Sequence, residues 1–318
     1  MGRRYNANFM RKAILLYNPL SGRNLKRRLA DVEAAASVLR AAGVEVSSAP
    51  TRAAADASEQ TQLAIAEGCD TVFACGGDGT IHDILQGLAK TNAALAVIPL
   101  GTANSLAHDL AIPFSPVNAA RAALKARIQK ITVGKVEFVN LEGQPAWRYF
   151  IVAAGIGVDA HLFYKLNGWA KQQLGMTSYY MKATELWLTH RMEKFEVEPV
   201  EGNGSRAEVS ELLAVRIRNF GNILRELAPG ASLERNDLRL VLCKTFSRTA
   251  YLRYVARGML GAKWNVRGIE LMHSAGAVCR PMPENRRRVY VEADGEILGT
   301  LPARISVVPD AANILMPR

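Results

Sequence analysis

The first 100 residues repeat one pattern, in which a short apolar run ends in a glycine-rich or polar segment and a helical stretch follows. Apolar runs at residues 13–17, 71–75 and 94–100 each have the length of a buried strand. Apolar residues recur at helical spacing between them, as in residues 25–39. This alternation predicts a parallel sheet that is covered by helices on both faces.

The pattern changes after residue 130. Alternating or apolar strands are predicted at residues 131–139, 149–153, 208–217, 238–243, 268–271 and 289–292. One long helical stretch, at about residues 168–195, interrupts them. We therefore predict an α/β first domain (residues 1–129) and a β-rich, sandwich-like second domain (residues 130–304), which suits a chain of 318 residues.

Charge and cysteine usage limit the class of protein. The net charge is +11, which favours acidic partners such as anionic lipids or polyphosphates. No nucleic-acid-binding motif accompanies this charge, so nucleic acid is not an expected partner. The four cysteines form no C-x-x-C pair, and no run of 18 apolar residues exists. We expect a cytoplasmic protein without a zinc site or a membrane span.

Residues 76–80, with the sequence Gly-Gly-Asp-Gly-Thr, lie between an apolar strand and a helix. Glycines let a backbone approach a phosphate closely, and a helix N-terminus offers unpaired N–H donors to an anion. Gly76, Gly77, Gly79 and Thr80 are therefore candidate phosphate-binding residues. Asp78 repels phosphate unless a cation or hydroxyl intervenes, and a tight turn that Asp78 caps is the alternative interpretation of this segment.

Two more polar loops follow predicted strands. Gly101, Thr102 and Asn104 come after the fourth strand, and residues 18–23 (Asn-Pro-Leu-Ser-Gly-Arg) come after the first. The latter loop offers a hydroxyl, a glycine and a cation in Ser21, Gly22 and Arg23. Ligands of open α/β sheets bind at the carboxyl ends of the strands, so three such loops predict one nucleotide site. Neither the Walker A nor the dinucleotide glycine fingerprint is present.

Near the C-terminus, Glu292-Ala-Asp294-Gly-Glu296 follows an apolar strand. Asp-Gly is a common hairpin pair, so a plain turn is one interpretation. The other interpretation is a pair of carboxylates, of which one holds a metal and one accepts a proton. The residues alone leave both open.

The motifs together resemble the diacylglycerol kinase catalytic-domain family, which includes bacterial diacylglycerol kinases, YegS-like lipid kinases, sphingosine kinases and ceramide kinases. The matching motifs are Asn18-Pro-x-Ser-Gly22, residues 76–80, Pro99-x-Gly-Thr-x-Asn104, Gly155-x-Gly-x-Asp-Ala160 and Asp294-Gly-Glu296. The resemblance covers nearly the whole chain. It implies a nucleotide domain like those of NAD kinases and phosphofructokinases, with residues 305–318 returning to it, and a β-rich lipid-binding domain.

The resemblance also implies an ATP-dependent, Mg²⁺-requiring lipid kinase that phosphorylates a hydroxyl of diacylglycerol or a related lipid. The residues implied to contact the nucleotide are Asn18, Ser21, Gly22, Thr51, Gly77, Asp78, Gly79, Thr80 and Thr102. Glu296 would accept the proton of the lipid hydroxyl, and Asp294 would support the metal or the acceptor. Asp78 stays a second candidate for the base, and a homodimer is compatible with the family.

Three positions depart from the family pattern. Ser105 and Thr132 stand where many members have Asp, and Arg235-Asn236 replaces an Asp-Gly that is linked to a second, structural metal in some members. Asn236 tolerates a left-handed backbone, so we expect the turn to persist and the second metal site to be lost.

Membrane contact is expected to be peripheral and anionic. The helical stretch near residues 168–195 carries Trp169, Tyr179, Tyr180 and Trp187 among lysines, a composition that suits a membrane interface. An ordinary amphipathic helix that covers the sheet is the alternative.

Two other functions stay open. An NAD kinase shares the Gly-Gly-Asp-Gly loop, although the late Asp294-Gly-Glu296 and the β-rich second half favour a lipid kinase. A non-catalytic nucleotide- or lipid-binding protein would explain the missing aspartates. The sequence does not identify the lipid or the oligomeric state.

Overall fold

The computed structural model describes residues 10–19, 27–51, 54–157, 192–200, 206–221, 227–262, 264–285 and 287–317. The chain forms two compact units. Unit 1 contains residues 1–133, 219–223 and 308–318, and unit 2 contains residues 134–218 and 224–307. Residues 219–223, which the sequence analysis counts with the second domain, therefore group with unit 1.

Unit 1 is an α/β layer structure with a parallel sheet. Its strands are β1 (Lys12–Tyr17), β2 (Glu45–Pro50), β3 (Thr71–Gly76), β4 (Ala94–Pro99) and the end of β15 (Glu296–Met316). They lie in the order β2-β1-β3-β4-β15, and every neighbouring pair is parallel. Strands β3 and β4 are buried along their whole length, as their continuous apolar sequences require.

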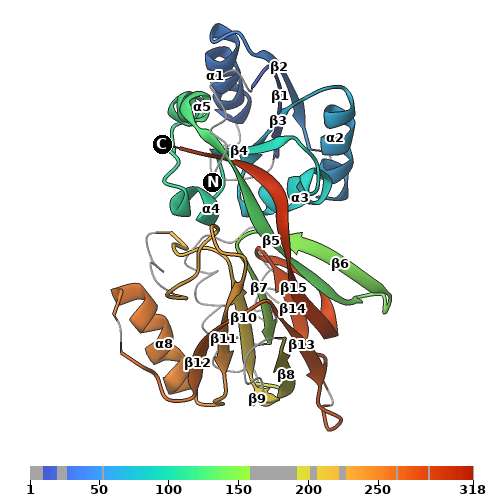
Figure 1. Cartoon of the computed structure of the whole chain (residues 1–318), viewed down its shortest axis with the longest axis vertical. Helices are drawn as coiled ribbons and strands as arrows, with labels where there is room; N and C mark the ends of the chain where they lie inside the picture. Colours follow the sequence, from blue (N-terminus) through green and yellow to red (C-terminus); the bar gives the residue numbers. More distant parts are fainter. Residues whose placement is uncertain are drawn as a thin grey trace. The chain divides into compact units, whose positions relative to one another are not determined.

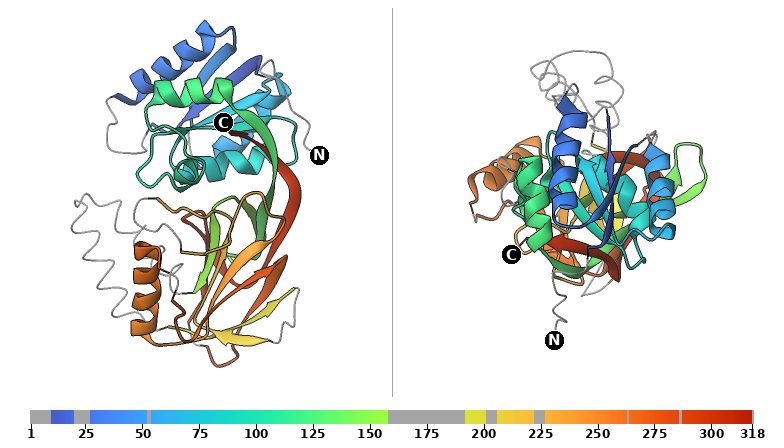
Figure 2. Two further views of the ribbon diagram at one scale, coloured as in Figure 1. Left: turned by 60° about the vertical axis from the view of Figure 1, so that its left-hand side comes forward. Right: turned by 90° about the horizontal axis from the view of Figure 1, so that it is seen from above.

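Helices cover both faces of this sheet, as the sequence predicts. They are α1 (Arg28–Ala41), α2 (Ala54–Ala66), α3 (Asp78–Leu88), α4 (Ser105–Asp109) and α5 (Pro116–Lys125). Helix α1 packs beside α5 and α2 beside α3, and the two pairs lie on opposite sides of the strands (Figures 1 and 2).

Unit 2 is built from antiparallel strands. They are β5 (Arg127–Asn140), β6 (Pro145–Phe150), β7 (Ala153–Gly157), β8 (Phe195–Pro199), β9 (Ala207–Val209), β10 (Glu211–Val215), β11 (Leu238–Cys243), β12 (Ile269–Ser274), β13 (Gly276–Pro281), β14 (Tyr290–Ala293) and most of β15. One run is β12-β11-β10-β7-β14-β15, and another is β8-β13-β15-β5-β6. Helix α8 (Arg248–Leu260) follows β11.

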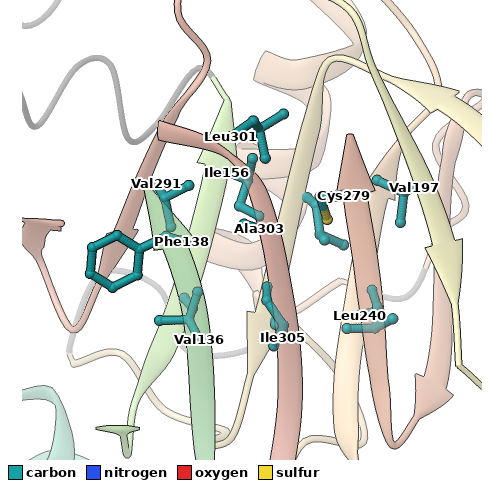
Figure 3. Close-up of a cluster of buried hydrophobic side chains, with 14 of the residues drawn as sticks. Val136, Phe138, Ile156, Val197, Leu240, Cys279, Val291, Leu301, Ala303 and Ile305 are labelled. Carbon is teal, nitrogen blue, oxygen red and sulfur yellow. The ribbon is translucent and has the colours of Figure 1, made fainter. Parts of the chain in front are cut away.

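The core of unit 2 lies between these two runs of strands. Val291 and Ile156 come from one run, Val136 and Val197 come from the other, and Ile305 comes from the strand that both runs share (Figure 3). The side chains are apolar and buried, as alternation along sandwich strands requires. The predicted combination of an α/β unit and a β-rich, sandwich-like unit is confirmed.

Some predicted elements need correction. Residues 149–153 are not one strand, because β6 ends at Phe150 and β7 begins at Ala153. The predicted strand at residues 208–217 is divided into β9 and β10 at Ser210. The turn expected before β11 is present at residues 232–235, where the Arg235 amide donates to the Ser232 carbonyl, although Asn236 does not adopt a left-handed backbone.

The long helical stretch predicted near residues 168–195 lies largely outside the described residues. No helix in the described part of the chain combines the length and the apolar character that crossing a bilayer would need.

Candidate nucleotide site and catalytic carboxylates

The parallel strands of unit 1 have their carboxyl ends at one edge of the sheet, and backbone hydrogen bonds join the loops there. The Thr51 amide donates to the Tyr17 carbonyl over 2.8 Å, which continues β2 beside β1. The amides of Leu100 and Gly101 both donate to the Gly76 carbonyl, over 2.9 and 3.0 Å. The loops that follow β3 and β4 are therefore held together, as their positions in the sequence predict (Figure 1).

Glycine is required where these two loops touch. A Cβ built on Gly101 would lie 2.3 Å from the Gly77 Cα, and one on Gly76 would lie 2.2 Å from the Thr80 hydroxyl. Carbon atoms at optimal separation are about 3.5–4.0 Å apart, so a side chain at residue 101 would force the loops apart. The two glycine loops thus form one backbone surface at the N-terminus of α3.

Asp78 joins the two loops from the first turn of α3. Its Oδ2 accepts the Ser105 amide over 3.0 Å and its Oδ1 accepts the Leu106 amide over 3.3 Å. These amides belong to the first turn of α4, where backbone donors lack helical partners. Asp78 therefore caps α4, and its catalytic role stays a prediction.

Asn104 braces the loop after β4. It is buried in a left-handed backbone conformation with a φ of 51°. Its side-chain oxygen accepts the Gly101 amide over 3.0 Å, and its nitrogen donates to the Gly101 carbonyl over 2.9 Å. The side chain fixes the shape of the loop, and direct contact between Asn104 and a nucleotide stays a prediction.

A pocket of about 390 Å³ opens beside this loop. Gly101, Thr102 and Asn104 line it, as expected of nucleotide-binding residues, together with Arg28, Asp31 and Phe114. Its volume lies within the range of small-molecule sites, roughly 300–1,000 Å³. Thr102 is exposed at this pocket, where its hydroxyl is available to a ligand.

The sequence analysis did not single out Arg28. Arg28 is only 4% exposed, and its Nη1 donates to the Leu100 carbonyl over 3.0 Å. Burial lowers its pKa, and the neighbouring Asp31 opposes that shift. A cation in the first turn of a helix opposes the helix dipole, and this was the signal in the sequence.

Other predicted nucleotide residues are distributed as follows. Thr51 and Asn18 lie at the ends of β2 and β1 on the same sheet edge, and Thr80 is buried in α3. Gly79 lies in the first turn of α3. Ser21, Gly22 and Arg23 lie outside the described residues.

The late acidic motif forms a hairpin turn in unit 2. Asp294 and Gly295 have φ values of 50° and 85°, and they join β14 to β15 with Ala293 paired to Glu296. Positive φ at both central residues is typical of a type I′ turn. Glu296 is exposed at the first position of β15. The hairpin interpretation is therefore confirmed, and it places the proposed proton acceptor on a rigid element.

The Asp294 carboxylate is 7% exposed and bonded to backbone. Its Oδ1 accepts the amides of Val152 and Ala153 over 2.8 and 3.1 Å, and its Oδ2 accepts the Ile151 amide over 3.1 Å. These three amides lie at the corner between β6 and β7. Their hydrogen bonds to Asp294 explain why β6 and β7 are two separate strands. This geometry gives Asp294 a structural role, and its role in metal binding stays a prediction.

The Gly155 motif lies in β7, between two buried glutamates. A Cβ on Gly155 would meet Glu292 Oε1 at 2.7 Å, and one on Gly157 would meet Glu211 Oε2 at 3.0 Å. Glycine at both positions therefore makes room for these carboxylates. Asp159 and Ala160, which complete the motif, lie outside the described residues.

Family models match most of the chain. The diacylglycerol kinase catalytic domain matches residues 12–136, and the YegS C-terminal NAD kinase beta sandwich-like domain matches residues 151–316. A curated diacylglycerol kinase of Bacillus subtilis (strain 168) is 30% identical over 313 residues, which is 97% of each chain. The chain belongs to the diacylglycerol kinase family. Membership makes it a kinase-family phosphotransferase, and kinases use a nucleotide.

Other relatives agree with this assignment. A diacylglycerol kinase of Staphylococcus aureus (strain Newman) is 29% identical over 73% of this chain and 70% of its own. The crystal structure of a putative diacylglycerol kinase from Bacillus anthracis str. Sterne has a TM-score of 0.73 at 20% identity, and 96% of each chain is covered. A yeast NADH kinase, solved in complex with NADH, has a TM-score of 0.54 at 11% identity over 98% of this chain and 84% of its own. These two likenesses concern the fold alone.

Proposed function

We propose that this diacylglycerol kinase family member is an ATP- and Mg²⁺-dependent lipid kinase that transfers the γ-phosphate of ATP to a hydroxyl of diacylglycerol or a related lipid. The observation that supports it most is the contact between Gly77 and Gly101 beside the pocket of about 390 Å³. The relatives named diacylglycerol kinase support the class of acceptor.

Unit 1 is proposed to bind the nucleotide. Phosphoryl transfer asks a protein mainly to position the reactants and to neutralise charge. The backbone at Gly77 and Gly79 would bind the phosphates, since it begins α3 and carries no side chains. Thr80, Thr102 and Asn18 would add hydroxyl and amide contacts, and Arg28 would add positive charge at the pocket.

Asp78 fits a magnesium ion better than Asp294 does. Mg²⁺ is usually bound through one or two carboxylates together with substrate phosphates, and each carboxylate oxygen has two lone pairs. Asp78 lies in the first turn of α3, beside the glycine backbone that would bind the phosphates. Asp294 is nearly buried and already accepts three amides. The ion would neutralise phosphate charge.

Glu296 is the proposed proton acceptor for the lipid hydroxyl. A primary hydroxyl is a poor nucleophile at neutral pH, and a positioned base contributes about 100- to 10,000-fold. Glu296 is exposed and begins a 21-residue strand, so its backbone is well fixed. Asp78 remains the second candidate for this role.

The enzyme is proposed to act from the cytoplasm on lipid in an anionic membrane. The net charge of +11 supports attraction to such a surface. Cys69, Cys75, Cys243 and Cys279 are free and buried, which suits a reducing compartment.

The test incubates the purified protein with radiolabelled ATP and a total lipid extract and identifies the labelled lipid. Labelled phosphatidic acid or a related lipid phosphate supports the proposal. Glu296→Gln should lower kcat at least 100-fold with little change in ATP affinity, whereas Glu284→Gln, which changes another exposed glutamate of unit 2, should not. Phosphorylated NAD in a parallel reaction would instead indicate an NAD kinase. ATP binding without turnover would indicate a non-catalytic protein.

A further inference from the structure

Helix α8 presents an apolar face to solvent. Its residues Leu252, Met259 and Leu260 are 52%, 50% and 73% exposed, and Ala256 is exposed beside them. At 100° per residue these positions lie on one side of the helix. The exposed side is therefore the apolar side, which is the reverse of a surface helix that packs on a core.

The opposite side of α8 is buried, and it carries Tyr251, Tyr254, Arg257 and Gly258. Tyr254 and Arg257 point inward, and both donate hydrogen bonds to the Leu227 carbonyl. Gly258 packs against Leu227, where a Cβ would lie 3.4 Å from the Leu227 Cα. These contacts fix the rotation of α8 about its own axis, so Leu252, Met259 and Leu260 face away from the core.

The ends of α8 are also fixed. The Ser247 hydroxyl accepts the Ala250 amide at the N-terminus, and Gly261 ends the helix with a left-handed φ of 62°. Two exposed aromatic residues flank the helix, Phe246 at 41% and Trp264 at 47%. Trp residues are typical of the level of a membrane where lipid headgroups meet acyl chains.

Charge on this face distinguishes between occupants. Arg253 lies on the exposed side of α8 and Arg267 follows it, and in the described part of the chain neither pairs with a carboxylate. A second copy of this chain would bring the same cations and a further net charge of +11 to the interface. An anionic bilayer instead attracts cations and accepts apolar side chains.

We propose that the exposed face of α8, formed by Leu252, Arg253, Ala256, Met259 and Leu260 with Phe246 and Trp264 at its ends, docks onto an anionic lipid bilayer and inserts its apolar side chains. This docking face deepens the proposed function, because it would hold the enzyme at the surface that contains its lipid substrate. Binding then has an apolar component that survives high salt and an electrostatic component that does not.

The first experiment measures co-sedimentation of the full chain with vesicles of phosphatidylcholine and phosphatidylglycerol, without nucleotide. Leu252→Glu and Met259→Glu should each weaken binding about tenfold or more, since each replaces a buried apolar contact by a charge. Leu63→Glu is the matched control, because Leu63 is 57% exposed on α2 in unit 1, and it should bind like the wild type. The double variant Leu252→Ser/Met259→Ser, which adds no charge, should also bind weakly.

The second experiment uses Trp264 as a reporter. In a chain with Trp147, Trp169 and Trp187 replaced by Phe, vesicles with brominated acyl chains should quench the Trp264 fluorescence. Three results would each overturn the proposal: unchanged vesicle affinity in the Leu252 and Met259 variants, complete loss of wild-type binding in 0.5 M salt (~4 Å screening length), or no quenching. A dimer that Leu252→Glu dissociates without any change in vesicle affinity would assign the face to a second copy and also overturn it.

Activity separates this inference from the proposed function. Variants of the docking face should keep their activity on a water-soluble short-chain diacylglycerol and lose it on the same headgroup in vesicles. If no lipid is phosphorylated by the wild type but vesicle binding still falls in the variants, the kinase assignment fails and the docking face stands. If binding is unchanged while lipid is phosphorylated, the docking face fails alone.

Discussion

Among the described residues of unit 2, Arg216 is the largest fully buried side chain, and its neighbours explain how a cation is tolerated there. Its guanidinium donates to the Leu233 carbonyl over 3.1 Å and to the Asp237 carbonyl. Burial lowers the pKa of Arg216 to about 10, so it stays charged at neutral pH. The loop before β11 contains Arg235 and Asn236, which depart from the family pattern. Hydrogen bonds from Arg216 hold this loop in place, and the sequence analysis did not single out Arg216.

The first prediction concerns Gly101. Gly101→Ala should lower kcat/KM by about 100-fold, because the new Cβ would displace the Gly77 backbone and misplace the phosphate-binding surface. Steady-state kinetics with ATP and the identified lipid would measure it. Ala103→Ser changes an exposed residue of the same loop and is the control. Wild-type kinetics in Gly101→Ala would show that the contact between the two glycines is unimportant.

The second prediction separates structural from metal-binding roles of Asp294. Asp294→Ala removes the acceptor of three buried amides, so it should lower the free energy of unfolding by about 3 kcal/mol or more. Asp294→Asn keeps one acceptor oxygen and should cost less. Urea unfolding in the presence of a chelator tests both. An unchanged midpoint in Asp294→Ala would leave metal binding as the better explanation for this residue.

Single residues show where sequence reasoning reaches its limit. The glycines at 77 and 101 were recognisable because each follows an apolar strand. The bracing role of Asn104 was not, because its hydrogen bonds to Gly101 depend on a left-handed backbone that the loop imposes. Arg28 was missed because basic residues on a helix are usually solvated, and only its hydrogen bond to the Leu100 carbonyl reveals its place in the site.

At the scale of elements, α8 shows why periodicity alone can mislead. The sequence analysis predicted no helix at residues 248–260, although the apolar residues recur at helical spacing there. Patterning rules assume that the apolar side of a helix is the buried one. In α8 the buried side carries Tyr254 and Arg257 instead, so the usual distinction between core and surface residues fails.

The third prediction concerns the pair of strands β11 and β12. Burial lowers the pKa of His273 in β12, and Asp237, whose Oδ1 lies 3.3 Å from its Nδ1, opposes the shift only in part. A histidine with a lower pKa in the folded chain binds fewer protons than in the unfolded chain. Its contribution to stability is therefore present above about pH 6.5 and is lost as the pH falls through its folded pKa.

We expect the free energy of unfolding to decrease from pH 7 to pH 5, and His273→Gln to flatten that slope. Asp237 does not interfere in this range. Its pKa is lowered, first by a hydrogen bond from Arg235, so its own effect lies below about pH 4. Urea titrations at several pH values provide the measurement. An identical slope in His273→Gln would assign the dependence to another group.

At the scale of the whole molecule, two strands each run from one unit into the other, in addition to the short segment at residues 219–223 that groups with unit 1. Strand β5 leaves unit 1, and β15 returns to it and pairs in parallel with β4 through Asn313 and Ile314. The fold class could be predicted because strand patterns are local. The return through one 21-residue strand could be expected only from the family resemblance, because pairing between distant segments leaves no periodic signal in the sequence.

The fourth prediction tests this return. Ile314→Asp places a charge at a fully buried position of the unit 1 sheet, so it should destabilise unit 1 by several kcal/mol, about 3 or more. Hydrogen exchange should show lost protection in β3 and β4 and retained protection in β10 and β11. Arg304→Asp, at an exposed position of the same strand, is the control. Equal loss of protection in both units would mean that they unfold as one.

The pairing of β4 with β15 also sets an order of events during synthesis. A ribosome releases β1 to β4 early, and β4 then presents an open edge, with unpaired backbone donors and acceptors, until β15 emerges. Domains generally fold from the N-terminus as they are made, but the sheet of unit 1 is completed only by residues that follow unit 2 in the sequence. A ribosome that stalls before β15 would therefore display a first unit whose sheet has an open edge, and chaperones or proteases would act on that unit. Nucleotide binding would begin only when translation of β15 is complete.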